Sequence, residues 1–338
     1  MSIADRYILA GRGAEPRALR IFSAYQHCNW EDHNLGPALD SFGEHTHYDW
    51  LKDSPEFDQY AAGWHYGAKQ RMNARLLSRV LEGPKPDVFF GYLCGRHVFR
   101  GTIEAIRLYG VPSVNMSLDD KTHRYSALEP TGWAGMVDII SAFDLCWTSD
   151  PTALDWYAEH GARAIYLPAG ANPAVFVPRD CERDIPVLFV GKCYGRRAEI
   201  VAQLAEAGID VTCYGQGWPN GPVDTPTMVG LMNRAVITLG IGETGDPVKL
   251  SLKGRDFEAP MAGAMYLTQY NPELADWYEI GREIDTWATV PDLIEQIDNY
   301  LAHPWEAETI RHAGAERARR EHSWRRRFEV AFSALGVL

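Results

Sequence analysis

The sequence predicts an α/β protein made of two doubly wound parallel-sheet domains that follow one another along the chain. Apolar runs with strand character alternate with helical patterns from residue 18 to residue 168, as is typical of parallel sheets covered by helices. The alternation stops over residues 169–186, which are rich in Pro, Ala and charge, and then restarts. A chain of 338 residues is long enough for two domains of roughly 150 residues each.

The first domain is expected over residues 1–172. Its first strand is the apolar run at 18–25, and a helix at 67–82 ends before Pro84 and Pro86 because proline cannot continue a helix. In such sheets, ligands bind at the carboxyl ends of the strands. The remaining strands are expected at 87–92, 111–116, 142–148 and 164–168, with helices ending near Leu108 and Tyr157.

The second domain is expected over residues 173–315. Short runs of Val, Ile, Leu and Phe predict its strands, and the segments between them predict helices. No short-period repeat is present, so a solenoid is excluded. The strands are expected at 185–190, 211–215, 235–239 and 264–268, and the helices at 197–207, 228–234, 252–262, 273–278 and 290–302.

Composition and charge narrow the classes of protein. No apolar run approaches the roughly 20 residues that span a bilayer, and Asp5 and Arg6 stand where a secretory signal would begin, so we expect a cytoplasmic protein. The six cysteines form no Cys-x-x-Cys pair, which disfavours structural zinc and a disulfide framework. A net charge of −12 disfavours general binding to nucleic acid.

The chain ends in a basic segment that we expect to form one amphipathic helix over 316–338. Residues 311–329 hold seven Arg and three Glu. Trp324, Phe328 and Phe332 recur at intervals of four and form an apolar stripe. We expect this stripe to pack on the body of the protein, and peripheral contact with an anionic membrane surface is the alternative.

A first candidate phosphate site is the turn at 191–196, between a strand and a helix of the second domain. Gly191 allows close backbone approach, and Lys192, Arg196 and the helix N-terminus favour an anion. The turn lacks the spacing of a P-loop, and a simple turn with solvated cations is the alternative. The next strand ends in Gly215, and the loop through Trp218 is expected to shape the same pocket.

A second candidate site is the segment 248–260. It brings Lys253 and Arg255 to a helix start, where cations stabilise the charge of a leaving diphosphate. Glu258 follows one turn later, and a carboxylate there can accept hydrogen bonds from ribose hydroxyls. A solvated charged helix is the alternative.

Candidate catalytic residues follow strands of the first domain. Asp119 and Asp120 follow one strand, and a carboxylate there would act as general base on an acceptor hydroxyl. Helix capping or a bond to the neighbouring lysine is the alternative. His27, His97 and His123 occupy similar loops after strands, and each could equally have a structural role.

Two further patterns bear on cofactors. The chain holds no Asp-x-Asp, so a metal-bridged diphosphate is disfavoured and no metal or other cofactor is expected. Residues 240–245 fit Gly-x-Gly-x-x-Gly, but Asp246 and Pro247 follow where a dinucleotide-binding helix would start. We therefore interpret this segment as a loop, and NAD-dependent oxidation remains a distant alternative.

Several short motifs of the second half form a recognisable set. They lie at 189–191, 214–218, 253–263, 267–270, 279–283 and 322–324, with weaker counterparts at 119–120, 143–144, 149–150 and 167–173. The set resembles CgeB-like glycosyltransferases, which belong to the group-one transferases of the GT-B superfamily. The resemblance covers nearly the whole chain and is strongest from about residue 185.

This resemblance implies the GT-B fold: two Rossmann-like domains facing a central cleft, with a last helix crossing back to the first domain. It implies a nucleotide-sugar donor bound by the second domain. Glu258 matches the second glutamate of the Glu-x7-Glu pattern of retaining relatives, which is associated with ribose. Leu250 stands at the first glutamate of that pattern, so the family's sugar contact and its retaining stereochemistry do not carry over.

We therefore expect transfer of a sugar from a nucleotide diphosphate to an acceptor hydroxyl on a glycan, a protein or a small molecule. Arg196, Lys253 and Arg255 would hold the diphosphate, and Asp119 or Asp120 would face the acceptor. The alternatives are a GT-B-type nucleotide-sugar epimerase or hydrolase and a non-catalytic nucleotide-sugar-binding protein.

Overall fold

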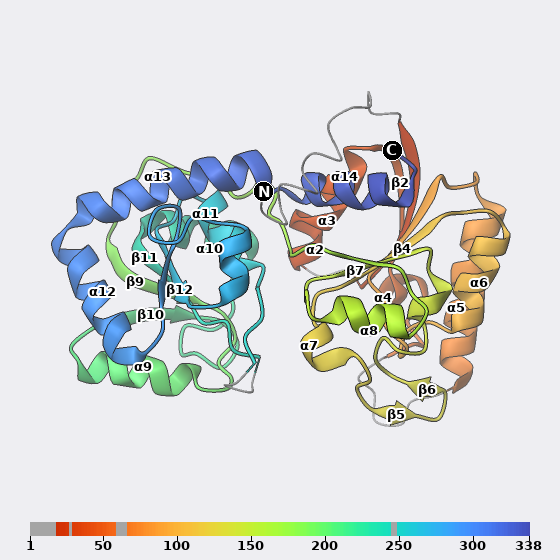
Figure 1. The fold of residues 1–338 in the computed structure, drawn as a ribbon, viewed down its shortest axis with the longest axis horizontal. Coiled ribbons are helices and arrows are strands. Elements are labelled where there is room, and N and C mark those ends of the chain that lie inside the picture. Colours follow the sequence, from red (N-terminus) through yellow and green to blue (C-terminus); the bar gives the residue numbers. More distant parts are fainter. Residues whose placement is uncertain (1–17, 27–28, 59–65, 245–248) are drawn as a thin grey trace. The chain divides into compact units, whose positions relative to one another are not determined.

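The computed structural model describes residues 18–26, 29–58, 66–244 and 249–338 (Figure 1). The chain divides into two compact units. The described residues between 18 and 168, together with Arg327–Leu338, form the first unit, and those between Ala169 and Arg326 form the second. His27 lies outside the described residues, as do residues 245–248 of the glycine-rich loop.

The first unit is built on a six-stranded parallel sheet with the order β2-β1-β3-β4-β7-β8. The chain adds β2 on one side of β1 and then crosses to β3 on the other side, so the order reverses between β1 and β3. The strands are β1 (Leu19–Ala24), β2 (Gly43–Tyr48), β3 (Val88–Gly91), β4 (Ser113–Ser117), β7 (Leu145–Thr148) and β8 (Ala164–Tyr166).

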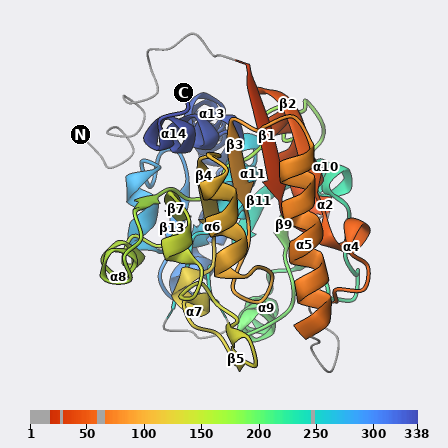
Figure 2. The ribbon, with the colours of Figure 1, turned by 90° about the vertical axis from the view of Figure 1, so that its right-hand side faces the viewer.

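Helices cover both faces of this sheet. Figure 2 shows α5 and α6 lying across one face, where Met72 and Ile103 join Phe22 and Phe89 in the core. A small hairpin, β5 (Leu128–Glu129) with β6 (Gly132–Trp133), stands apart from the sheet. The helical segments are α2 (Asn29–His33), α3 (Leu35–Asp40), α4 (Trp50–Asp53), α5 (Tyr66–Glu82), α6 (Arg100–Leu108), α7 (Asp120–His123), η1 (Ile140–Ala142), α8 (Ala153–Glu159) and α14 (Trp324–Leu335).

The last helix, α14, completes the other face of the first sheet. The ring of Phe328 packs edge-on against Phe90 at 5.0 Å and Trp147 at 5.5 Å, and Phe332 packs against Phe42 at 5.3 Å. This confirms the expected return of the chain to its first part. The apolar stripe is fully buried here, so it offers no apolar face to a membrane.

The expectation of a single helix over 316–338 is wrong. The segment belongs to two helices, α13 (Pro304–Glu321) and α14, which are separated by His322 and Ser323. The break is held by the backbone of Ala171, whose N–H donates to the His322 carbonyl at 2.9 Å and whose carbonyl accepts from the Trp324 N–H at 3.1 Å. Helical periodicity continues through the break, so the sequence pattern does not reveal it.

The second unit is built on a five-stranded parallel sheet with the order β10-β9-β11-β12-β13. Apolar residues of α9 and α12 form a core with one face of the sheet, and α10 and α11 contact the sheet as well. The strands are β9 (Ile185–Val190), β10 (Val211–Tyr214), β11 (Ala235–Gly240), β12 (Tyr266–Gln269) and β13 (Asp285–Trp287). The helical segments are α9 (Arg197–Glu206), α10 (Thr225–Arg234), α11 (Arg255–Met261), η2 (Pro272–Asp276), α12 (Val290–Ala302) and α13.

Two strands of the parallel sheets, β2 and β13, are absent from the sequence prediction, as are the two short strands of the hairpin. Both β2 and β13 lie at a sheet edge, and their sequences, GEHTHY and DTW, contain few apolar residues. An edge strand pairs on one side and needs less apolar surface than a central strand, so the hydrophobic pattern is weak there. In the described part of the chain, no helix combines the length and the apolar character needed to cross a membrane.

Candidate functional site

The candidate phosphate site lies in the second unit, at the carboxyl ends of β9 and β11. In the sheet, β10 lies on one side of β9 and β11 lies on the other side, so the strand order reverses at β9. Ligands of open α/β sheets bind at such a reversal. The loops after the two strands are joined, because the Tyr194 hydroxyl donates to the Glu243 carbonyl at 2.9 Å.

Arg197 is a second link between these loops. Its guanidinium donates to the carbonyl of Lys192 at 2.8 Å and to the carbonyl of Ile241 at 2.9 Å, and it lies 4.1 Å from the centre of the Tyr194 ring. Burial lowers the pKa of Arg197. Arg197 therefore holds the two loops of the site together. The sequence does not distinguish it from Arg196, because the direction of each side chain depends on how α9 begins.

Gly191, Gly215 and Trp218 come together at the edge of the site. Gly215 has a φ of 136°, and a Cβ there would lie 2.2 Å from the carbonyl oxygen of Gly191. The Trp218 indole N–H donates to the same carbonyl at 2.9 Å, and its ring packs against Phe189. Gly215 is therefore needed for a close backbone crossing, and Trp218 holds that crossing in place.

The loop cations differ in what they contact. Lys192 and Arg196 are exposed, and Lys253 is half-buried. Arg196 lies 3.8 Å from Oε1 of Glu243, a long ion pair that leaves the guanidinium able to turn toward an anion. Glu243 is buried at 1% exposure and is absent from the sequence candidates, although it lies inside the glycine-rich loop. Its second carboxylate oxygen has no hydrogen-bond partner among the described residues.

Arg255 and Glu258 form an ion pair in the first turn of α11. The Arg255 Nε also lies 3.4 Å from the Val190 carbonyl, which places the guanidinium at the end of β9. The Arg255 side chain is 25% exposed, whereas the Glu258 side chain is 1% exposed. Glu258 is therefore placed to orient Arg255, and a direct contact with ribose would require this buried carboxylate to move.

A buried carboxylate, Asp256, anchors the start of α11. It accepts hydrogen bonds from the Lys253 backbone N–H at 2.6 Å and from the Tyr266 hydroxyl at 2.8 Å. Burial raises the pKa of Asp256. The residue ties α11 to β12 and so fixes the position from which Arg255 reaches the end of β9.

A cavity of about 510 Å³ opens within the first unit, at the carboxyl ends of β1, β3 and β4. It lies beside the point where the strand order of this sheet reverses, so it occupies the place where such sheets bind ligands. Its wall is made by polar and apolar side chains: Gln26, Glu31, Trp50, Tyr92, Leu93, Cys94, Arg96, His97, Met116, Ser117, Leu118, Asp119, His123, Ser126, Ala134 and Met136.

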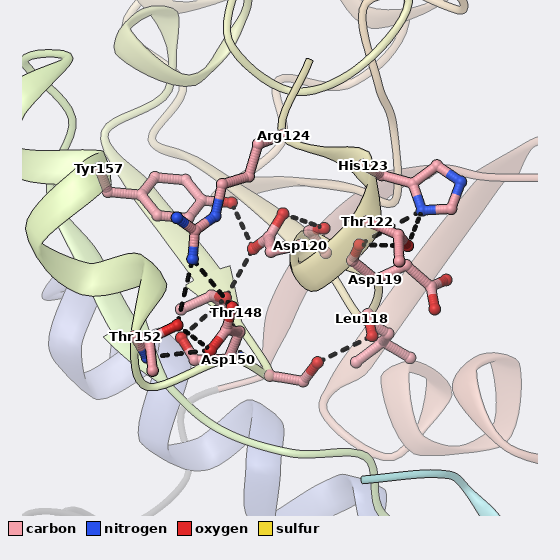
Figure 3. Close-up of polar contacts among 12 residues, drawn as sticks. Leu118, Asp119, Asp120, Thr122, His123, Arg124, Thr148, Asp150, Thr152 and Tyr157 are labelled. Carbon is pink, nitrogen blue, oxygen red and sulfur yellow. Dashed lines mark hydrogen bonds and ion pairs between the residues drawn. The ribbon is translucent and has the colours of Figure 1, made fainter. Parts of the chain in front are cut away.

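The neighbouring aspartates of the first unit lie on opposite sides of α7 (Figure 3). Asp119 is exposed, makes no capping hydrogen bond and lines the cavity. Asp120 is buried at 1% exposure and accepts hydrogen bonds from three hydroxyl groups. The donors are Ser117 at 2.6 Å, Thr148 at 2.6 Å and Tyr157 at 2.9 Å.

Asp120 is therefore an anchor. Burial raises its pKa, and its hydrogen bonds join β4 to β7 and α8. A second set of contacts on the same side of α7 joins Arg124 to Asp150 at 3.0 Å and to Thr152 at 3.2 Å (Figure 3). Together they hold α7 so that Asp119 and His123 remain at the cavity, and of the two aspartates only Asp119 is placed to meet a ligand.

His97 lines the same cavity but is poorly suited to act as a base. Its ring stacks on Trp50 at 4.5 Å, and Nδ1 accepts a hydrogen bond from the Cys94 N–H at 3.1 Å. Burial lowers the pKa of His97 to about 3. Since proton affinity decides how well a base works near neutral pH, a neutral imidazole with so low a pKa removes protons poorly.

Comparison with known proteins shows which protein family the second unit resembles. Residues 196–332 match the model of the family described as glycosyl transferase-like. This part of the chain is therefore similar to a glycosyl transferase-like domain. The match includes the cations and glycines of the candidate site from Arg196 to Glu258. It confirms glycosyltransferase as the predicted class of enzyme and leaves the narrower CgeB-like resemblance a prediction.

Solved structures confirm the predicted GT-B fold. Sucrose-phosphate synthase (tll1590) from Thermosynechococcus elongatus is similar at a TM-score of 0.62 and 12% identity, over 94% of this chain and 97% of that one. A glycosyltransferase from Rickettsia africae ESF-5 gives 0.63 and 8%, over 94% and 98%. Anabaena Alr3699/HepE, solved in complex with UDP and glucose, gives 0.59 and 10%, over 94% and 99%. No curated protein sequence matches.

Proposed function

We propose that the protein transfers a sugar from a nucleotide-diphosphate donor to an acceptor hydroxyl, with the donor bound by the second unit. The observation that carries the donor assignment is the placement of Arg255 at the end of β9, oriented by the buried Glu258. A partly exposed guanidinium at a strand-order reversal can bind a diphosphate and stabilise the charge that develops as it leaves. The structure of HepE with UDP and glucose supports a donor of this class.

The cations would bind the diphosphate from different positions. Arg255 contacts it first because its orientation is already fixed, and the exposed Arg196 and half-buried Lys253 close on it from the two flanking loops. Three cations would balance a charge that metal-dependent enzymes neutralise with Mg²⁺. We therefore propose that transfer needs no metal, and unchanged activity in excess EDTA would support this.

Asp119 is the proposed base toward the acceptor. It is the exposed aspartate at the cavity of the first unit, where a hydroxyl could approach its carboxylate. His123 lies at the same cavity on the same side of α7 and would orient the hydroxyl (Figure 3).

A cytoplasmic location would fit this proposal, because the cysteines within the described residues are free thiols.

Donor binding is tested by thermal shift against UDP-, GDP- and TDP-sugars. One donor should raise the melting temperature of the protein, and Arg255→Ala and Glu258→Ala should each abolish that rise while leaving the circular dichroism spectrum unchanged. Arg282→Ala is the matched control, since Arg282 also pairs with a glutamate three residues away but lies on the surface. Normal donor shifts in both site variants would overturn the assignment.

Transfer itself is tested by following nucleotide release with and without acceptors. A glycosyltransferase releases nucleotide faster when an acceptor is added, and the sugar appears on that acceptor. Equal release without an acceptor would identify a hydrolase, a changed sugar on the intact donor an epimerase, and binding without turnover a non-catalytic protein.

A further inference from the structure

We propose that the cavity of the first unit binds a small, electrically neutral acceptor with an apolar aromatic body and a reacting hydroxyl group. The proposal rests on the function proposed above and names the acceptor class that it leaves open. The volume, the charge and the apolar part of the cavity support it.

The volume indicates a compact molecule. About 510 Å³ lies within the range of roughly 300–1,000 Å³ that is typical of small-molecule sites. The cavity belongs to one unit, with its lining drawn from the loops after β1, β3 and β4 and from the hairpin region. A small acceptor can therefore be enclosed by this unit alone.

The charges around the cavity disfavour an anion. Two carboxylates, Glu31 and Asp119, face it together with one guanidinium, Arg96. Arg96 is already paired with Glu129 at 2.6 Å, so its charge is balanced within the protein. The burial of His97 keeps its imidazole neutral, and so His97 adds no positive charge. A phosphate or carboxylate group would meet a negative field, because like charges at short range repel.

Part of the cavity wall is apolar, and the rest carries polar side chains. Trp50, Leu93, Met116 and Met136 line the apolar part and are all nearly fully buried. Methionine sulfur and an indole ring make favourable contacts with an aromatic ring, whereas a sugar hydroxyl placed against this apolar part would lose water without gaining a partner.

Asp119 then determines which end of the acceptor reacts. It immediately precedes α7, at the outer end of β4, and is exposed, while the apolar residues are buried. An acceptor with its ring in the apolar part would present its hydroxyl to Asp119. The proton of that hydroxyl would pass to the Asp119 carboxylate as the oxygen forms its bond to the sugar carbon and the nucleoside diphosphate leaves.

Binding without a donor tests the acceptor class independently of transfer. Isothermal titration calorimetry of the full chain with 4-hydroxybenzyl alcohol should show binding, and the anion 4-hydroxybenzoate, which has the same ring, should bind about tenfold or more weakly. Glucose should also bind more weakly than the aromatic alcohol. Equal or tighter binding of 4-hydroxybenzoate, or preference for glucose, would overturn the proposal.

Leu118 provides the site variant, because it lines the cavity and is only half-buried. Leu118→Glu should weaken binding of the aromatic alcohol about tenfold or more by adding a charge. If Leu118→Glu fails to fold, Leu118→Ala should still weaken binding by about threefold through lost apolar contact. Leu108→Glu is the control, since Leu108 is 89% exposed and lies outside this cavity. This variant should bind the aromatic alcohol with unchanged affinity. Unaltered affinity in both Leu118 variants would place the ligand elsewhere.

If these ligands bind as expected but no donor supports transfer to them, the cavity assignment stands and the proposed transferase activity fails. If transfer proceeds to an anionic acceptor, the activity stands and the acceptor class fails.

Discussion

At the scale of single residues, the adjacent aspartates Asp119 and Asp120 lie in different environments. The two side chains differ by one position and leave α7 on opposite sides (Figure 3). Three hydroxyl donors surround the carboxylate of Asp120, whereas Asp119 is exposed at the cavity. A base must be accessible to its substrate, so the two residues should respond to mutation in different ways.

Asp119→Asn should lower kcat by about 10²–10⁴-fold, because an amide cannot accept the hydroxyl proton. Its melting temperature should stay unchanged. Asp120→Ala should instead lower the free energy of unfolding by about 1–3 kcal/mol, since three buried hydroxyls lose their acceptor. Kinetics and chemical denaturation of both variants measure this, and full activity in Asp119→Asn would remove it as the base.

His97 should make the stability of the first unit depend on pH. Burial lowers the pKa of this imidazole from 6.5 to about 3, so the unfolded chain binds the proton more tightly than the folded one. The stabilisation is complete above about pH 6.5 and is lost as pH falls toward about 3. His97→Asn should therefore flatten the fall in unfolding free energy over this range.

The control for this pH dependence is His312→Gln, because the His312 side chain is 82% exposed. Its stability should follow the pH profile of the unmodified protein. Buried Asp120 has the opposite effect. Because its pKa is raised, its contribution to the free energy of unfolding increases as the pH falls. The test is therefore the difference between the two variants, and an identical acid slope in both would contradict the assignment.

At the scale of elements, the ends of the strands form the candidate site of each unit. In the second unit, the turns after β9 and β10 cross so closely that a side chain at Gly215 would meet the Gly191 carbonyl. In the first unit, the ends of β1, β3 and β4 open onto the cavity. Each site depends on a buried aspartate, Asp256 or Asp120, that holds a helix start in place.

Gly215→Ala should destabilise the second unit by about 2 kcal/mol or more, because Gly215 combines a positive φ with a Cβ contact of 2.2 Å. Gly208→Ala is the matched control, since Gly208 also has a positive φ but its Cβ would meet no atom within 4 Å. The control should lose only about 1 kcal/mol. Equal losses in chemical denaturation would show that the crossing is not the cause.

The elements also show where prediction from sequence reaches its limit. Central strands such as β3 and β9 are continuous apolar runs and are predicted within two residues. The edge strand β2 reads GEHTHY, and its pairing with β1 depends on contacts across 24 residues of chain from Leu19 to Gly43. Local pattern carries no record of such pairing, so β2 becomes visible only in the folded sheet.

At the scale of the whole molecule, the chain returns to its first unit after completing the second. Residues Arg327–Leu338 belong with 18–168, and Phe328 is fully buried between Phe90 and Trp147. The first unit therefore cannot complete its core until the last helix has been made. A sequence that folds this way should lose stability in its first unit when its last helix is altered.

Phe328→Ala should lower the unfolding free energy of the first unit by about 3–5 kcal/mol through the cavity it leaves. Hydrogen exchange should show the loss in β1, β3 and β7, while β9 and β11 keep their protection. Trp305→Ala, at a site 66% exposed on α13, should change neither. Equal loss of protection in both units would contradict a separate role for α14.

The sequence by itself determined the alternation of strands and helices and the division into two sheets, because these follow from local apolar patterns. It also supplied the cations of the proposed donor site, from residue types next to strand ends. Tertiary structure alone decided that Arg255 pairs with Glu258, that Arg197 braces two loops and that Asp119 rather than Asp120 faces the cavity. These outcomes depend on the direction of each side chain within a folded turn, and that direction is set by packing between segments far apart in the chain.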